Sequence, residues 1–252
     1  MTTPTIERIH QHGSVRHYRS DPVAEDLIES IVEAGQRAST SSNLQTYSVV
    51  VTREENKRLR LRELCGDQKH ITQAPVFLTW CADYSRLKRV CRHQGYQLEA
   101  GYLENFLVGA VDAALAMQNA ALAAESLGLG FCYIGAIRNQ PSEVVELLDL
   151  PDLVFPISGM TLGWPQKKPR IRPRLSLEAV LHWESYQRDD REFLEDYDRA
   201  MIATGIYRGR QVDRQDQEEN RYGWMEHSAR RARKPSRPHL KDEIRKAGFS
   251  LR

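Results

Sequence analysis

Apolar and polar residues recur at helical spacing in some stretches of the chain and form continuous apolar runs in others. Residues 22–37 are predicted to form an amphipathic helix that begins at Asp21 and Pro22, a pair typical of an N-cap followed by proline. Its recurring apolar positions are Val23, Leu27, Ile31 and Ala34. Strands are predicted in the apolar runs at residues 47–52, 74–82, 131–137 and 154–163. Shorter helices are predicted at residues 56–64 and 141–148.

The longest predicted helix runs from about residue 104 to 127 and ends before Gly128, a residue suited to the position that follows a helix. Its middle is rich in alanine and nearly uncharged, so we expect burial on most of its circumference. Its small side chains would suit a central helix or a subunit interface. Helices and strands alternate through residue 164 without the strict repeat of a doubly wound sheet, which predicts an α+β fold.

The composition changes after residue 165 to a basic segment that contains several prolines. Further helices are predicted around residues 189–204 and 218–234, separated by the polar sequence RGRQVDRQDQ. A short amphipathic helix is expected near the C-terminus and should end at Gly248. The sequence has no internal repeat.

Composition and charge restrict the class of protein. The chain has 252 residues, of which 40% are hydrophobic and 28% charged, as in ordinary globular proteins. A net charge of +2 gives no overall attraction to nucleic acid or to a membrane. Cys65, Cys81, Cys91 and Cys132 lack zinc-ligand spacing and are expected to be free thiols. The N-terminus has no apolar signal core and no apolar run approaches membrane-spanning length, so we expect a cytoplasmic protein.

A polar cluster occurs near the N-terminus, in the sequence HGSVRHY. His12, Ser14 and Arg16 alternate there, so in an extended segment their side chains would share one face. The same pattern also fits a solvated edge.

Two further candidate groups lie later in the chain. Prolines would hold Arg170, Arg172 and Arg174 in an extended segment, and guanidinium groups suit a phosphate. The alternative for these arginines is a solubilising surface loop. The amide of Gln68, in GDQKH, could bond a ring carbonyl.

The stretch from residue 39 to 43 joins a predicted helix to a predicted strand without Gly or Pro. Its sequence is Ser39, Thr40, Ser41, Ser42 and Asn43. Such side chains can hydrogen-bond local backbone, so the helix end could be held by its own hydroxyls. Alternatively, the hydroxyls could face a ligand with many hydrogen-bonding groups.

Common catalytic motifs are missing from the sequence. It contains neither GxGxxG after a strand nor GxxxxGK[ST], which disfavours a conventional Rossmann or P-loop site. It also lacks GxSxG and HExxH, and its eight histidines show no metal-ligand spacing. Serine hydrolase and zinc enzyme classes are therefore disfavoured, and no metal site is expected.

Seven motifs occur in a fixed order along the chain: HGSVRHYRS, ASTSSNLQTYS, LCGDQKH, APVFLTWCAD, DAALAMQNAALAAESLGLGFCYIGAIRN, LPDLVFPISGMTLGWP and KPRIRPRLS. Together they resemble the FMN-dependent nitroreductase superfamily, most closely its oxygen-insensitive NADPH nitroreductases and NADPH–flavin oxidoreductases. The resemblance extends from about residue 6 to the C-terminus. It implies a mostly antiparallel central sheet flanked by helices, a C-terminal helical extension and a homodimer. The whole chain would be one FMN-binding domain, with a core at about residues 6–186 and a helical excursion with a dinucleotide-binding loop at about 187–252.

The resemblance also implies an FMN site at the dimer interface, to which both subunits contribute. The implied FMN-binding residues are His12, Gly13, Ser14, Val15, Arg16, Ser39, Ser41, Gln45, Gln68, Tyr133, Ile134, Gly135, Ala136, Arg172 and Arg174.

Roles within this set follow from the same resemblance. The phosphate would be held by His12, Ser14, Arg172 and Arg174. Arg16 would lie at the N1–C2=O edge of the flavin, and Gln68 at its pyrimidine end. The segment from Ser39 to Gln45 would approach the flavin across the dimer, and residues 133–136 would line the isoalloxazine ring. Arg208 would bind the 2′-phosphate of NADPH.

The chain departs from the family pattern at several places. The family usually has Arg in place of Gly13, Gly in place of Ala136 and Lys in place of Arg172. The segment QVDRQDQEENRYG is also longer than its counterpart, which bears on the second contact to the dinucleotide.

The implied activity is a ping-pong, two-electron reduction of nitroaromatics, quinones or free flavin by NADPH, with NADH as the alternative donor. Hydride would pass to flavin N5 without a protein acid or base, and Arg16 would stabilise negative charge near N1. One alternative is a flavin-binding protein of the same fold without reductase turnover. Another is a nucleic-acid binder, suggested by HSARRARKPSRPHLK but disfavoured by the near-zero net charge. We therefore expect neither a nucleic-acid nor a membrane partner.

Overall fold

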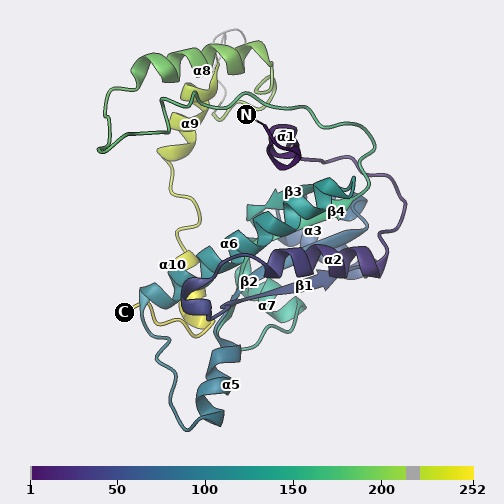
Figure 1. The fold of residues 1–252 in the computed structure, drawn as a ribbon, viewed down its shortest axis with the longest axis vertical. Helices are drawn as coiled ribbons and strands as arrows, with labels where there is room; N and C mark the ends of the chain where they lie inside the picture. Colours follow the sequence, from purple (N-terminus) through teal and green to yellow (C-terminus); the bar gives the residue numbers. More distant parts are fainter. Residues whose placement is uncertain (1, 214–221) are drawn as a thin grey trace. The chain divides into compact units, whose positions relative to one another are not determined.

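The computed structural model describes residues 2–213 and 222–252, which form two compact units (Figure 1). The first unit comprises Met1–Arg170 together with Arg237–Arg252, and the second comprises Ile171–Ser236. The C-terminal residues therefore return to the unit in which the chain begins.

The first unit is built on a four-stranded sheet with the strand order β1-β2-β4-β3. The strands are β1 (Tyr47–Thr52), β2 (Val76–Asp83), β3 (Gly130–Ile134) and β4 (Val154–Gly163). Every pairing between these four strands is antiparallel. The predictions of an α+β fold and of a mostly antiparallel sheet are confirmed.

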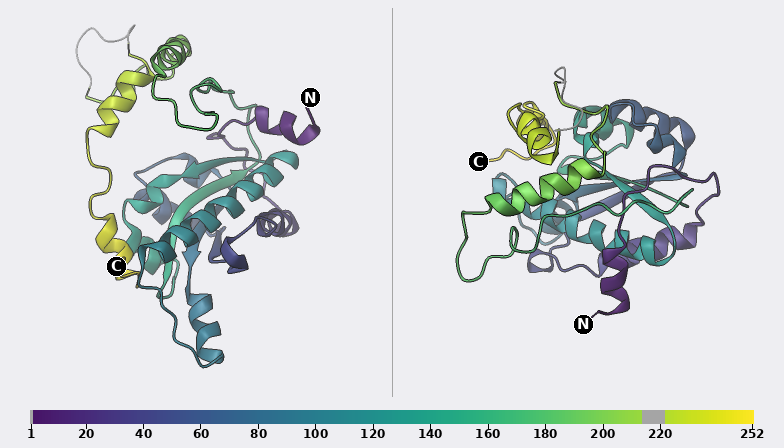
Figure 2. Two further views of the ribbon diagram at one scale, coloured as in Figure 1. Left: turned by 60° about the vertical axis from the view of Figure 1, so that its left-hand side comes forward. Right: turned by 90° about the horizontal axis from the view of Figure 1, so that it is seen from above.

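Helices cover both faces of the sheet, as the alternation of side chains along β2 shows. Leu78 and Trp80 face a core formed with α2 (Glu25–Gln36) and α6 (Leu103–Ser126), which lie side by side in Figures 1 and 2. Phe77 points to the opposite face, where it packs with residues of α3, α4 and α7. These helices span Glu55–Leu64, His70–Gln73 and Pro141–Leu147.

The close approach of α2 and α6 requires small side chains. A Cβ atom added to Gly35 of α2 would lie 3.0 Å from the carbonyl oxygen of Ala116 in α6. The alanines of α6 therefore let a second helix pack beside it on the sheet.

The remaining helices lie outside these two layers. In the first unit they are α1 (Pro4–His10), α5 (Ser85–His93), α10 (Leu240–Lys246) and the 3₁₀ turns Ser41–Asn43 and Gly135–Arg138. In the second unit, α8 (Arg191–Ala203) packs against α9 (Trp224–Ala232). The sequence predicted α8, α9 and α10. The predicted start of the second of these, at residue 218, lies outside the described residues.

The C-terminal segment completes the core of the first unit. Phe249 is fully buried and meets Phe106 of α6 edge to face, with ring centroids 5.4 Å apart. Gly248, at φ +98°, ends α10 as predicted. The backbone N–H of Arg252 donates to the carbonyl of Gly101 at 2.8 Å. This return is what joins residues 237–252 to the sheet.

Two predicted element boundaries were wrong by three residues. The helix expected to start at Pro22 starts at Glu25, because the Pro22 carbonyl accepts a hydrogen bond from the Trp164 indole and Val23 is buried before the helix begins. The strand expected to reach residue 137 ends at Ile134, where the chain turns into a 3₁₀ helix.

The expected burial of α6 on most of its circumference was also wrong within the single chain. One face of the helix is buried. Elsewhere on the helix, four large apolar side chains are 46–57% exposed: Leu103, Leu107, Val111 and Leu115. By length and composition, α6 could also cross a membrane, contrary to the expectation that no segment approaches that length. This is weak evidence for a span, since a core helix of a soluble protein meets the same criteria, and the other face of α6 packs against the sheet and α2.

Candidate functional site

The N-terminal polar cluster lies along the outer edge of β3. The backbone N–H of Val15 donates to the carbonyl of Phe131 at 2.8 Å, which holds the segment extended beside the strand. Val15 is buried, whereas the side chains of Ser14 and Arg16 are exposed. The alternation predicted from the sequence therefore leaves these two polar groups available to a ligand.

Gly13 lies where a side chain has no room. A Cβ atom at this position would lie 2.8 Å from the Pro169 Cβ atom and 3.0 Å from the Arg170 carbonyl oxygen. The resembling family usually has arginine at this position. In this chain Gly13 stands there, and the segment that contains Pro169 packs closely against it.

The serine-rich loop, residues 39–45, is held by a buried carboxylate of helix α6. Asp112 of α6 is 1% exposed. Its Oδ1 atom accepts the backbone N–H of Ser41 at 3.0 Å, and its Oδ2 atom accepts both the N–H and the hydroxyl of Thr46, at 3.1 and 2.7 Å. A buried charge with three donors is well satisfied, so it fixes both ends of the turn.

The turn between these two anchor points has an unusual backbone. Ser42, Asn43 and Gln45 all have positive φ values, of 47°, 55° and 53°, although none is glycine. Such conformations cost energy in a non-glycine residue and persist where the surroundings impose them. Arg86 adds a further support, because its Nη1 atom donates to the Gln45 carbonyl at 2.8 Å.

The hydroxyls of the loop are not used to hold its own backbone. Among the hydrogen bonds of the described residues, none runs from the hydroxyls of Ser39, Thr40, Ser41 or Ser42 to neighbouring backbone. These side chains are exposed or half-buried. The interpretation in which these hydroxyls hold the helix end is therefore not supported among the described residues, and a role in ligand binding stays a prediction.

Gln68 and His70 lie at the start of α4. The Gln68 side-chain nitrogen donates to the Cys65 carbonyl at 2.9 Å, which orients the amide and leaves its oxygen as an acceptor. Burial, together with the nearby positive charges of Arg16 and His17, lowers the pKa of His70 to about 4. The neutral His70 ring has a buried Nε2 atom without a hydrogen-bond partner among the described residues.

The end of β3 supplies the predicted ring-lining residues. Tyr133 is half-buried, and its hydroxyl donates to the Gln118 side-chain oxygen at 2.9 Å. Burial raises the pKa of Tyr133, and the nearby charge of Glu125 raises it further. Ile134 is buried, while Gly135 and Ala136 begin the 3₁₀ turn and are half-buried.

Three predicted arginines belong to the second unit. Arg172, Arg174 and Arg208 are all exposed. Their assignment to phosphate groups stays a prediction.

Arg208 lies in a turn bounded by Gly205 and Gly209, both at positive φ. It borders a pocket of about 60 Å³ that Tyr207 and Tyr222 also line. The Tyr207 ring stacks on His227 at 4.4 Å. These aromatic contacts order the turn that carries Arg208. Residues 214–221, which make up most of the longer segment QVDRQDQEENRYG, lie outside the described residues.

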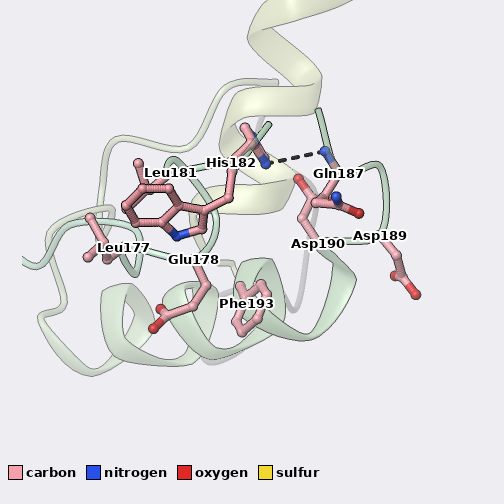
Figure 3. Close-up of a pocket in the computed structure, with 9 residues that line it drawn as sticks. Leu177, Glu178, Leu181, His182, Gln187, Asp189, Asp190 and Phe193 are labelled. Atoms are coloured by element: carbon pink, nitrogen blue, oxygen red, sulfur yellow. Dashed lines mark hydrogen bonds between the residues drawn. The ribbon is translucent and has the colours of Figure 1, made fainter. Parts of the chain in front are cut away.

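A larger pocket of about 420 Å³ in the second unit contains none of the predicted site residues (Figure 3). Its apolar lining consists of Leu177, Leu181, Phe193 and Trp183, the last of which is 75% exposed. Glu178, Asp189 and Asp190 supply its carboxylates. An apolar surface of this kind is typical of a protein contact.

The sequence reasoning missed three polar residues: Asp112, Glu125 and His70. Asp112 had a usable signal, because it is the charged residue in the alanine-rich middle of a helix expected to be buried. Glu125 had a signal of its own, because it lies in the last turn of a helix. The helix dipole is unfavourable for a carboxylate there, so a nearby cation is expected. The partners of both residues are far away in sequence, so the sequence alone could not supply them.

The exposed polar side chains along the edge of β3 and in the serine-rich loop are candidate ligand contacts carried by the α+β frame. Residues 9–164 match the nitroreductase family, and residues 172–252 match the nitroreductase family, C-terminal domain. The chain therefore belongs to the nitroreductase family.

Individual relatives extend this comparison over the full length. The chain is 38% identical to an oxygen-insensitive NADPH nitroreductase of Salmonella typhimurium, over 99% of this chain and 100% of the relative. It is 37% identical to an FMN reductase [NAD(P)H] of Bacillus subtilis, over 98% of each chain. The structure of NADPH:FMN oxidoreductase from Vibrio harveyi complexed with NAD+ superposes with a TM-score of 0.88 at 34% identity, covering 99% of this chain and 100% of the other.

The carboxylate of Asp112 leads to a first prediction. Replacing Asp112 by Asn removes the charge and points an amide nitrogen at a backbone N–H. We expect the free energy of unfolding to fall by about 3 kcal/mol, since hydrogen bonds to charged groups contribute about 1.5–3 kcal/mol each. Hydrogen exchange at the Ser41 and Thr46 amides should also become faster.

A matched control for this variant is Asp21→Asn, because the Asp21 side chain is 55% exposed. Its stability should stay within about 0.5 kcal/mol of the parent, as is usual for surface substitutions. Equal stability of the two variants, with unchanged exchange at Ser41 and Thr46, would show that Asp112 does not hold the loop.

Proposed function

We propose that this protein is an FMN-containing oxidoreductase that uses NADPH, or NADH as the alternative donor, to reduce nitroaromatics, quinones or free flavin. The observation that carries the proposal is the serine-rich loop, whose backbone is held by Asp112 while its hydroxyls have no hydrogen-bond partner among the described residues. The names of the full-length relatives support the same class of reaction.

The polar side chains of the first unit fit FMN by their chemistry. The hydroxyls of Ser14, Ser39 and Ser41 can donate to flavin or phosphate oxygens, and the Gln68 amide oxygen can accept from the flavin ring N–H. His12 keeps its Nε2 atom uncommitted among the described contacts, because Nδ1 bonds Glu125. The proposed contacts of FMN are therefore with these groups and with the segment from Tyr133 to Ala136.

When bound, FMN supplies the two-electron redox chemistry. The chain itself contributes binding, orientation and charge. Arg16, exposed beside the β3 edge, is proposed to place a cation at the N1–C2=O edge of the ring, where negative charge would be stabilised. The loop from Ser39 to Gln45 is proposed to orient the ring, and Arg208 to bind the 2′-phosphate of the dinucleotide.

A homodimer is part of the proposal. Exposed leucines and a valine on α6 would be covered by a second subunit, as apolar patches on soluble proteins usually are. In the second unit, Trp183 lines the pocket of Figure 3 and is exposed. The exposed Tyr186 ring lies 4.4 Å from the ring of His182 in the same lining, and both residues support the same conclusion. We further propose that residues 1–252 act as one FMN-binding domain and that the protein is cytoplasmic.

The proposed activity can be tested by the visible spectrum of the purified protein. We expect a yellow protein with FMN as its flavin, which loses its visible absorbance when NADPH is added anaerobically and regains it on addition of a quinone. A protein that binds FMN but shows neither change would be a flavin-binding protein without turnover. A protein that binds no FMN would contradict the proposal entirely.

The arginines after Pro169 give a second test. Replacing both Arg172 and Arg174 by Ala should weaken FMN binding by about a hundredfold or more, because hydrogen bonds to charged groups contribute about 1.5–3 kcal/mol each. Equilibrium dialysis measures the effect. The double variant Arg188→Ala, Arg191→Ala removes two cations from the same unit and should retain FMN. Equal retention by both double variants would make Arg172 and Arg174 surface charges.

Nucleotide preference tests Arg208. The variant Arg208→Ala should lower kcat/KM for NADPH by about tenfold to a hundredfold and change that for NADH little, because the lost contact is to the 2′-phosphate. Arg210→Ala, two residues further along the chain, is the matched control. Equal losses with both nucleotides would mean that Arg208 supports its turn and does not select the nucleotide.

A further inference from the structure

His12 is held by a carboxylate from the far end of the core helix. Its Nδ1 atom lies 2.7 Å from Oε1 of Glu125, in the last turn of α6. The two side chains are 29% and 14% exposed, so water screens this pair less than it would a surface pair. The imidazole also stacks on Phe131 of β3, with ring centroids 5.2 Å apart. The stacking contact and the hydrogen bond together fix the orientation of the imidazole ring.

The hydrogen bond determines which nitrogen of His12 can meet a ligand. An ionised carboxylate only accepts hydrogen bonds, so the proton of this contact is on Nδ1. The other nitrogen, Nε2, points away from Glu125 because the two nitrogens lie on opposite sides of the ring. When the ring is protonated, Nε2–H is a charge-assisted donor suited to a phosphate oxygen.

Cations lie on the Glu125 side of this pair. Glu125, but not His12, lines a cavity of about 400 Å³ whose lining also includes the cations Arg8, Lys167 and Lys168. Glu125 is the carboxylate in that lining, and unpaired it would repel a phosphate. When His12 is protonated, its ion pair with Glu125 offsets this charge, and the carboxylate then supports a hydrogen-bond donor.

We infer that Glu125 is a positioning residue for phosphate binding: it holds His12 through Nδ1 so that Nε2 is presented to the phosphate of FMN. The inference rests on the proposed function, in which His12 binds that phosphate. It adds a residue from α6 that does not itself touch the ligand. The competing explanation is a purely structural ion pair that ties the N-terminal segment to the end of α6.

Comparison of FMN with riboflavin separates the two explanations, because riboflavin has the same ring and lacks the phosphate. Dissociation constants for both flavins would be measured on the flavin-free full-length protein by quenching of flavin fluorescence. For Glu125→Gln we expect FMN affinity to fall about tenfold with riboflavin affinity unchanged, since a charge-assisted bond to the donor is lost. The control Glu104→Gln, at the other end of the same helix, should change neither affinity.

A double-mutant cycle tests whether Glu125 acts through His12. In the background His12→Ala, the further change Glu125→Gln should leave FMN affinity unchanged or raise it, because the histidine to be positioned is gone and a negative charge is removed. An equal fall in FMN and riboflavin affinity in Glu125→Gln would overturn the inference in favour of a structural role. So would an unchanged FMN affinity. A parent protein that binds neither flavin would instead contradict the proposed function.

Discussion

The buried carboxylate of Asp112 is the interaction on which the candidate site depends. Burying a charge is costly unless hydrogen bonds compensate it, and here three donors from Ser41 and Thr46 do so. Because Asp112 projects from the helix that packs against the sheet and α2, the loop takes its shape from the core of the unit. The positive φ values at its centre are tolerated for the same reason. Among the described residues the loop hydroxyls form no hydrogen bonds to neighbouring backbone, so they can bond a ligand.

A single helix organises two polar segments that are distant in sequence. The middle of α6 holds the serine-rich loop through Asp112, and its last turn holds the N-terminal segment through Glu125 and His12. The alanines between them let α6 pack closely on α2 while the opposite face keeps exposed leucines. The same helix can therefore fix a site on one side and offer an apolar surface to a second subunit on the other.

Local patterns in the sequence predicted much of the fold. The strands at Tyr47–Thr52 and Val154–Gly163 were placed at both ends, because their apolar runs are bounded by polar and glycine residues. The start of α2 was misplaced because a tertiary hydrogen bond from Trp164 holds Pro22 outside the helix. The candidate ligand groups came from motifs, whereas the residues that position them did not. Asp112 and Glu125 act on partners more than sixty residues away, so only the folded chain reveals them.

A crystal structure of the full-length protein with FMN bound would show whether Asp112 shapes the loop that contacts the flavin. We predict that the Asp112 carboxylate keeps its contacts to Ser41 and Thr46 and that hydroxyls of the same loop lie within hydrogen-bonding distance of the flavin. A loop that has released Asp112 in order to reach the flavin would contradict it. So would a flavin bound away from the loop.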